Sequence, residues 1–258
     1  MTSVRVARSS LPEPAADKPL PLTPPLPWKR LLGTAALLPS LVAGVVAGVV
    51  GGAVAGPVVF VAVGGAVVAW VWRQSARPEA IGLGGRPADP VRDARLINLV
   101  EGLCASAGVR LPDLWIIDAS GLNLAVGGRN PTKAAIVVTS GLLQHLDRVE
   151  LEGMLASGVI AIRRDAVAGP SIAAVTGISV NVAVGLGRDI LLDAAAVRLT
   201  RYPPGLRAAL QALLERGTAV PGVPRRAAHL WLADPTDAPA LPAYRRPLRE
   251  RIDALTEL

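Results

Sequence analysis

The chain has 258 residues, enough for one domain with appended segments. Its 27 Lys and Arg against 20 Asp and Glu give a formal net charge of +7, but only 3% of residues are aromatic and no basic run is interleaved with aromatic residues, which argues against a nucleic-acid partner. The single cysteine, Cys104, excludes an intramolecular disulfide and is expected to be a small core residue.

Residues 1–28 are rich in proline among small and charged residues. Such a segment has no periodic apolar face to bury, so we expect a disordered, partly extended tail. The segment lacks the order of a signal peptide, because the apolar stretch that follows begins too late and continues too long.

Residues 31–72 contain no charged side chain. One membrane span needs about 20 apolar residues, so this length suits two spans, with a glycine-rich turn between them. Basic residues flank both outer ends: Lys29, Arg30, Arg73 and Arg77. A transmembrane hairpin is therefore predicted over 29–73, with the bilayer as a partner and with the amino terminus and the main domain on the cytoplasmic side. A buried hairpin of a soluble core is the alternative, and it fits the flanking charges poorly.

A Gly/Pro-containing linker over 74–90 precedes a region of mixed periodicity. The pattern predicts a helix over 91–107, strands over 111–118 and 134–139, and a helix that opens at Ser140. Residues 149–165 carry apolar side chains at helical spacing and predict a buried helix. Residues 166–187 are uncharged but too few for a second hairpin, so a buried or shallow membrane-contacting helix is expected there.

The predicted helix 149–165 resembles the active-site helix of the M48 (HtpX/Ste24-like) zinc metallopeptidases, whose pattern is E-x-E-x-x-x-A-H-E-x-x-H. Glu150, Glu152 and Ala156 fit this pattern in register. The resemblance extends over about 91–258, with the hairpin in its general place. Further matching positions precede and follow the helix: Asn123, Gly127, Pro131, Thr139, Gly141, Leu142, Leu143, Pro203, Leu206, His229, Pro247, Arg251 and Ile252. The fold that it implies is α+β, a mainly helical gluzincin-type metallopeptidase domain with a small β-sheet behind a two-helix transmembrane hairpin.

The residues that perform the family's chemistry are missing from this register. Ser157 and Ala161 stand where the two zinc-binding histidines belong, and Gly158 stands where the catalytic glutamate belongs. In active relatives the histidines hold zinc and the glutamate is the general base for the metal-bound water. Asp189 matches the third ligand, one methylene shorter than the family's glutamate, and Asp193 matches the carboxylate that supports it. The resemblance thus implies a degenerate member with no catalytic residue and no zinc or other cofactor.

Only two histidines occur in the chain, His145 and His229. A zinc site rebuilt from these two and Asp189 would require three separated segments to converge with suitable geometry, which is disfavoured.

In this family the substrate lies antiparallel to an edge strand near the zinc helix. Its expected counterpart here comprises Ala134, Ala135, Ile136, Val137, Val138 and Thr139. Strand addition uses main-chain groups and does not need zinc. The sequence therefore favours an inactive M48 homologue that binds a peptide or membrane-protein partner or regulates an active relative. An active peptidase with unorthodox metal ligands and a structural subunit of a membrane complex are the alternatives.

Overall fold

The computed structural model describes residues 28–52, 54–77, 84–177, 188–236 and 245–257. The predicted disordered tail lies outside the described residues except for Trp28, which begins the first helix. Residues 78–83 of the predicted linker and residues 178–187 of the apolar stretch also lie outside them.

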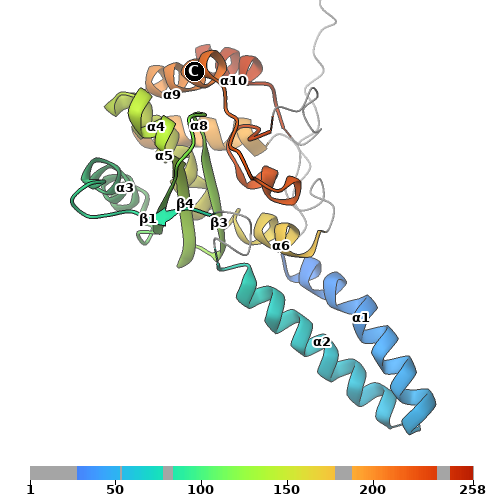
Figure 1. Ribbon diagram of the computed structural model, residues 1–258. Coiled ribbons are helices and arrows are strands. Elements are labelled where there is room, and N and C mark those ends of the chain that lie inside the picture. The colour runs from blue at the N-terminus through green and yellow to red at the C-terminus, as the bar shows by residue number, and fades with distance from the viewer. Residues whose placement is uncertain (1–27, 53, 78–83, 178–187, 237–244, 258) are drawn as a thin grey trace, which may run out of the picture.

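Two apolar helices project from the rest of the molecule as a hairpin (Figure 1), α1 (Trp28–Gly51) and α2 (Ala55–Gln74). Both are long and apolar enough to cross a membrane, and only 11% of the most apolar window of each is buried. Glycines allow the two backbones to approach closely, because a Cβ added to Gly56 would lie 2.9 Å from the carbonyl oxygen of Gly44. The predicted two-helix hairpin is confirmed as a structural element.

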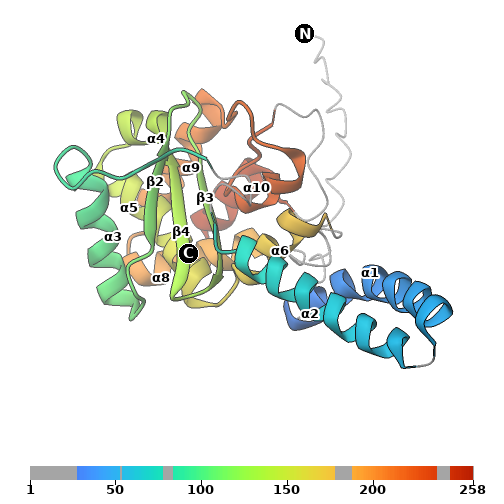
Figure 2. The same ribbon diagram turned by 60° about the horizontal axis from the view of Figure 1, so that its bottom comes forward.

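A four-stranded sheet forms the centre of the main domain (Figure 2), with strand order β1-β2-β4-β3. The strands are β1 (Arg86–Pro87), β2 (Asp113–Ile117), β3 (Leu124–Asn130) and β4 (Lys133–Thr139). Strand β4 pairs with β2 in parallel and with β3 in antiparallel orientation. The two predicted strands are confirmed within a few residues of their expected ends.

The segment predicted as a linker contains the short strand β1, which pairs with β2 at Arg86 and Ile116. The preceding Gly85 has φ +120°, and a Cβ there would lie 2.5 Å from the carbonyl oxygen of Ile116. Only glycine permits this close approach.

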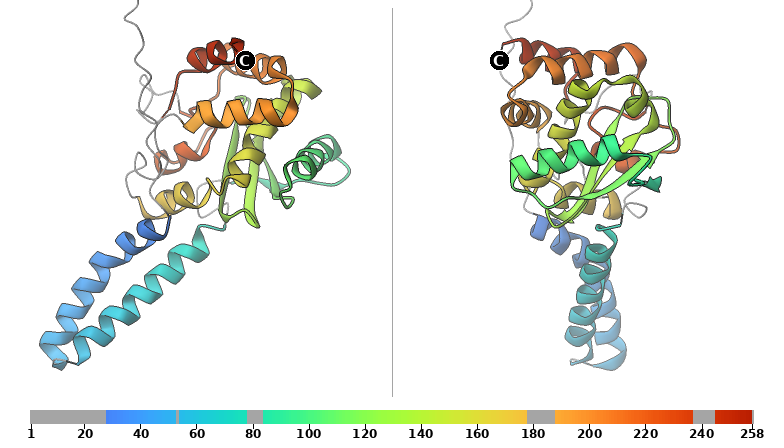
Figure 3. Two further views of the ribbon diagram at one scale, coloured as in Figure 1. Left: turned by 180° about the vertical axis from the view of Figure 1, so that it is seen from behind. Right: turned by 90° about the vertical axis from the view of Figure 1, so that its left-hand side faces the viewer.

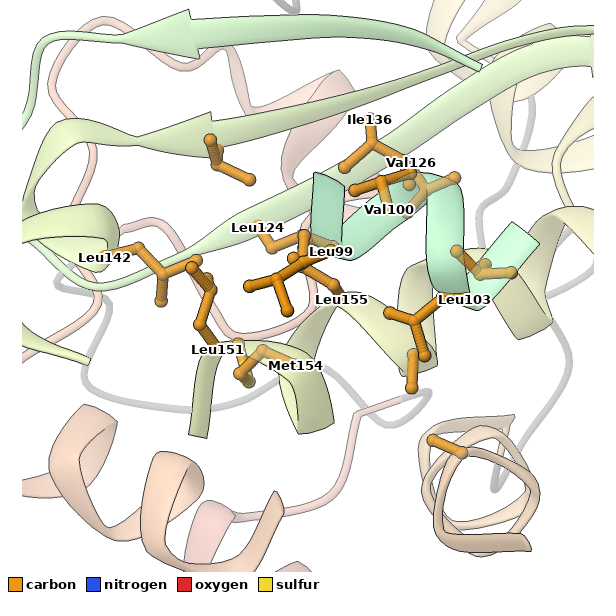
Figure 4. Close-up of a cluster of buried hydrophobic side chains, with 14 of the residues drawn as sticks. Leu99, Val100, Leu103, Leu124, Val126, Ile136, Leu142, Leu151, Met154 and Leu155 are labelled. Carbon is orange, nitrogen blue, oxygen red and sulfur yellow. The ribbon is translucent and has the colours of Figure 1, made fainter. Parts of the chain in front are cut away.

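Alternate side chains of the strands enter two different apolar clusters. On one face, β-strand residues such as Ile136 pack against α3 (Ala94–Ala107) and α5 (Arg148–Arg163). Figure 4 shows this cluster, in which Leu99 and Leu155 lie close to Leu124 of β3. On the other face, the cluster joins the sheet to Trp231 and to η1 (Arg225–Leu230). Cys104 is buried in the first cluster, as expected.

The helix α6 (Ala168–Thr176) connects the domain to the hairpin. Ile172 and Ala173 are buried against Leu31, Leu32 and Val71 of the hairpin. This arrangement agrees with the buried helix expected within 166–187, as far as the structure describes that stretch. At the end of β3, the guanidinium of Arg129 lies 5.6 Å from the ring centroid of Trp72 and adds a second contact between domain and hairpin.

Two of the remaining helices, drawn in orange, lie beside α5 (Figure 3). Helices α8 (Arg188–Thr200) and α9 (Pro203–Arg216) both pack against α5, and α10 (Leu248–Thr256) packs on α9. The short α4 (Ser140–His145) follows β4 directly and packs against that strand. The small sheet and the predominance of helices confirm the predicted α+β fold with its amino-terminal hairpin.

Candidate functional site: a cavity beside the central helix

Helix α5 positions the residues that stand in the zinc-binding register. It begins with a capping box, in which the Asp147 carboxylate accepts the N–H of Glu150 and the Glu150 carboxylate accepts the N–H of Asp147, both at 2.8 Å. Every residue from Gly153 to Ile162 is buried. Ser157 and Ala161 are four residues apart, so they lie on the same face of this helix.

That face borders a small cavity of about 50 Å³. Ser157, Gly158 and Ala161 of α5 line it together with Asp189 and Asp193 of α8. The structure therefore brings together the five residues that the family resemblance assigns to zinc-site positions: Ser157, Gly158, Ala161, Asp189 and Asp193. Burial raises the pKa of Asp193, and the positive charge of Arg251 opposes this effect.

The residues of this cavity do not fit a zinc ion. The side chains of Gly158 and Ala161 have no donor atoms, and the described residues contain no group of three or more His, Cys, Asp or Glu that could hold a metal. Asp189 is engaged by the main chain, because its Oδ2 accepts the N–H of Arg246 at 2.9 Å.

Asp193 is held by a buried ion pair with Arg251. Arg251 Nε and Nη2 donate to the two carboxylate oxygens of Asp193 at 2.7 and 2.8 Å, and Nη1 donates to the carbonyl oxygen of Leu232 at 2.9 Å. The side chains of the two partners are only 1% and 3% exposed. Such a bidentate contact satisfies the carboxylate that a metal-binding site would use for support.

Two further arginines reach the same cavity. Arg188 Nη2 donates to the carbonyl oxygen of Ala166 at 2.8 Å, and burial lowers the pKa of this guanidinium to about 10. Arg245 Nη2 donates to the carbonyl oxygens of Ala228 and Trp231 at 2.9 and 3.1 Å. At neutral pH both guanidinium groups remain charged, so with Arg251 three such groups surround the cavity.

His229 also lines the cavity and is 3% exposed. Its Nε2 lies 2.7 Å from the carbonyl oxygen of Pro170, so this nitrogen carries the proton and Nδ1 has the lone pair. Burial lowers the pKa of His229 to about 4, which keeps the ring neutral at pH 7. His145 lies apart on α4, with Nδ1 2.9 Å from the carbonyl oxygen of Gly141, and does not line this cavity. The three-segment zinc site therefore does not assemble, although His229 and Asp189 share the cavity.

Sequence reasoning missed Arg188 and Arg245 as members of the site, and it named Arg251 only as a match to the family pattern. A signal was available for Arg188, which directly precedes Asp189. No local signal marks Arg245, because it reaches the cavity from a segment more than 50 residues further along the chain.

The prediction that Ala134–Thr139 forms an edge strand is wrong. Strand β4, which contains Ala134–Thr139, lies between β2 and β3 and pairs with both. Its main-chain groups are therefore occupied on both sides, and no peptide can add to it while the sheet is intact. The sequence shows consecutive strands but not their order in the sheet.

The edge strand on this side is β3, and its outer side is partly covered. Leu232 N–H donates to the carbonyl oxygen of Leu124 at 2.7 Å, and Trp231 forms an isolated bridge with Ala125. Further along, the N–H of Gly128 donates to the hydroxyl of Ser171 on α6 at 2.8 Å. Leu124 and Val126 of this strand border the cavity.

Comparison with curated sequences finds proteins named protease HtpX homologues. The protein from Acidiphilium cryptum is 30% identical over 248 residues, covering 78% of this chain and 85% of its own length. The protein from Tropheryma whipplei strain Twist is 27% identical over 247 residues, covering 78% and 84%. The one from Dictyoglomus turgidum is 29% identical over 206 residues, covering 62% and 68%. No family model matches the chain, and no solved structure is significantly similar to it.

Proposed function

Because the chain belongs to the HtpX-like branch of the M48 metallopeptidase family, we propose that it is a membrane-anchored, catalytically inactive homologue that acts by binding a peptide or a membrane-protein partner. One observation carries this proposal: Ser157, Gly158 and Ala161 line a cavity that three guanidinium groups border. In the register proposed for α5, these three residues hold the positions of the two zinc ligands and the general base of active relatives.

The charge of the cavity supports the loss of catalysis. A divalent cation placed among Arg188, Arg245 and Arg251 would be repelled at short range in a poorly solvated site, where charges interact more strongly than in water. The two carboxylates that could offset this repulsion already have partners. Asp193 accepts hydrogen bonds from the Arg251 guanidinium, and Asp189 accepts the main-chain N–H of Arg246. Without a metal-bound water and a carboxylate base, the hydrolysis that active members of the family catalyse lacks its nucleophile and its general base.

The hairpin supplies the anchor. We propose that both of its outer ends face the cytoplasm, because basic residues flank those ends and the connecting turn contains none. The main domain and the cavity then lie on the cytoplasmic side, where partners would be cytoplasmic segments of membrane proteins or peptides near the bilayer.

Metal analysis and a cleavage assay on the same purified sample test the proposal. The full chain is extracted in mild detergent, its zinc content is measured, and an unfolded protein substrate is added with and without a chelator. We expect zinc well below one ion per chain and no chelator-sensitive cleavage. Stoichiometric zinc together with cleavage that the chelator abolishes would instead establish an active peptidase with unorthodox ligands.

Affinity purification from native membranes separates binding from a purely structural role. A regulator or peptide receptor is expected to capture partners through the main domain, so a variant whose hairpin packing is disturbed should retain them. Stoichiometric co-purification that depends on the hairpin would favour a structural subunit of a membrane complex.

A further inference from the structure

A second, larger hollow of about 770 Å³ lies between the carboxyl ends of α5 and α8, beside the last turn of α3. Its volume is in the range of clefts that hold ligands. Four exposed arginines line it: Arg163, Arg164, Arg198 and Arg201. Ile160 and Ala195, which also line it, are buried, so the hollow combines apolar side chains with a basic rim.

The positive charge of this hollow is not compensated by the part of the chain that the structure describes. No described Asp or Glu lines the hollow, and the four guanidinium groups make no hydrogen bond or ion pair with a described residue. Asp165 directly follows Arg164, but its carboxylate forms no ion pair either. The carboxyl ends of α5 and α8 stabilise nearby cations, which explains why the arginines are tolerated there. The hollow still carries four positive charges, and a cleft lined by charges of one sign concentrates ligands of the opposite sign.

The type of side chain indicates the kind of anion. All four basic residues of the hollow are arginines and none is a lysine. The planar guanidinium group donates two parallel hydrogen bonds to one phosphate group, which a lysine ammonium group cannot do. A hollow with arginines from two helices is therefore suited to a phosphate group that enters between them.

The hollow belongs to the end of the domain that carries the hairpin. Three residues separate Arg164 from α6, a distance of at most about 14 Å, and α6 packs on Leu31 and Val71 at the ends of the two hairpin helices (Figure 1). Arg30 and Arg73 are exposed at the same helix ends. In a bilayer that the hairpin spans, these ends lie at the level of the lipid headgroups.

The phosphate groups that are concentrated beside this end of the domain are those of the lipids. Basic residues close to a membrane are attracted to anionic lipids, whereas zwitterionic lipids carry no net charge. The uncompensated charge of the hollow therefore favours an anionic phospholipid over a zwitterionic one.

We propose that the hollow between α5 and α8 binds the phosphate headgroup of an anionic phospholipid and thereby docks the domain on the bilayer surface. The inference goes beyond the proposed function and holds whether or not the protein binds zinc, because none of the residues of this hollow lines the cavity that contains Ser157 and Asp189.

The first experiment titrates the full chain, purified in an uncharged detergent, with short-chain phosphatidylglycerol and follows its thermal unfolding. The melting temperature should rise with a saturable dependence on the lipid, and 1 M salt should weaken the effect by screening the charges. Phosphatidylcholine of the same chain length, inorganic phosphate and oligoglutamate should give little shift. Equal stabilisation by phosphate or oligoglutamate would overturn the lipid assignment, and no shift with phosphatidylglycerol would overturn the site itself.

Substitutions separate the hollow from the basic ends of the hairpin. Arg163→Gln with Arg198→Gln removes one arginine from each helix, and each loss is expected to weaken phosphatidylglycerol binding about fivefold, so roughly 25-fold together. The matched control is Arg207→Gln with Arg216→Gln, which changes the total charge equally at exposed positions of α9. The hairpin is unchanged in both variants, so the difference between them reports on the hollow. Melting temperatures without lipid check folding, and equal lipid affinities of the two variants would overturn the proposal.

Nanodiscs test docking on a bilayer. A fluorophore on Ser106→Cys, at an exposed position that lines the hollow, should be quenched more by spin-labelled headgroups in discs with phosphatidylglycerol than in discs of phosphatidylcholine alone. Cys104 is buried, so the label reacts with the introduced thiol. The variant with Arg163→Gln and Arg198→Gln should lose most of the difference between the two kinds of disc. Equal quenching of the otherwise unchanged chain in both kinds of disc would show that the hollow does not meet anionic headgroups and would overturn the docking.

Discussion

Replacing Arg251 with methionine should destabilise the domain more than any other single arginine substitution on α10. The change leaves the Asp193 carboxylate buried without its cation, since the two side chains are 1% and 3% exposed. Breaking a buried pair by removing one partner costs roughly 3–5 kcal/mol. For a chain of this size that corresponds to a fall of roughly 10 °C in melting temperature.

The pH dependence of this variant has a definite sign. Burial already raises the pKa of Asp193, with Arg251 opposing it, and removal of Arg251 raises that pKa further. A carboxyl group whose pKa is higher in the folded than in the unfolded state stabilises the fold at low pH and loses this contribution as the pH rises through the folded value. The deficit of Arg251→Met relative to wild type should therefore be smaller at about pH 5 than at about pH 7.

Thermal melts of the detergent-solubilised full chain measure the effect. Arg246→Met is the matched control, because Arg246 pairs with the 45% exposed Glu250 at 3.1 Å and such exposed pairs contribute at most about 1 kcal/mol. The double change Asp193→Leu with Arg251→Met should recover most of the loss, since both charges are then absent. A melting temperature of Arg251→Met within about two degrees of the wild-type value would mean that Asp193 and Arg251 do not form a buried ion pair.

Three further changes test other parts of the structure. Acidification should destabilise the domain through His229, because burial lowers the pKa of this residue from 6.5 to about 4. The stability present above pH 6.5 is therefore lost as the pH falls towards 4, by roughly 3 kcal/mol. In His229→Phe the melting temperature should depend less on pH over this range. In intact cells, an impermeant thiol reagent should label Val54→Cys at the hairpin turn but not Arg77→Cys, and the reverse pattern would contradict the proposed orientation. Gly56→Val should loosen the hairpin because its Cβ meets the backbone of Gly44 at 2.9 Å, as measured by cross-linking between α1 and α2, whereas Gly65→Val, with nothing within 4 Å, should not.

Local patterns were sufficient to predict most of the elements. The absence of charge over 31–72 predicts the hairpin because a membrane span depends on composition alone, and the apolar spacing of α5 predicts a buried helix because its face is set by residues within a few turns. The parallel pairing of β2 with β4 and the inner position of β4 could not be predicted in this way. They depend on β2 and β3 pairing with opposite sides of β4, which no local pattern records. The two-residue strand β1 has no periodicity to detect.

The set of residues that line the cavity could not be predicted from the sequence either. The register of α5 predicts that Ser157 and Ala161 share one helix face, because their spacing of four residues follows helix geometry, and both line the cavity. The arginines that now surround it come from the start of α8 and from two places near the carboxyl end of the chain. In sequence each is an ordinary charged residue of the kind that usually lies on the surface, and only the folded chain brings the three together.

The surrounding arginines lead to a prediction about rebuilding the zinc site. Introducing His, Glu and His at positions 157, 158 and 161 with Glu at position 189 would restore the donor set, but the zinc ion would then lie near Arg188 and Arg245. At an effective dielectric constant of about 20, one guanidinium roughly 7 Å from a divalent cation opposes binding by roughly 5 kcal/mol before screening by solvent. The four-residue variant should therefore bind zinc weakly.

Adding Arg188→Gln and Arg245→Gln to the four-residue variant should strengthen zinc binding by at least tenfold, because the local repulsion is removed while the Arg251 pair stays in place. The matched control adds Arg207→Gln and Arg216→Gln, two exposed arginines of α9, which change the total charge equally and should have little effect. The new side chain at Gly158 requires Leu124 and Val126 to move slightly, since a Cβ would lie 3.3 Å from each, so correct folding is checked by the melting temperature. A folded six-residue variant that binds zinc no better than wild type would mean that the register assigned to α5 is wrong.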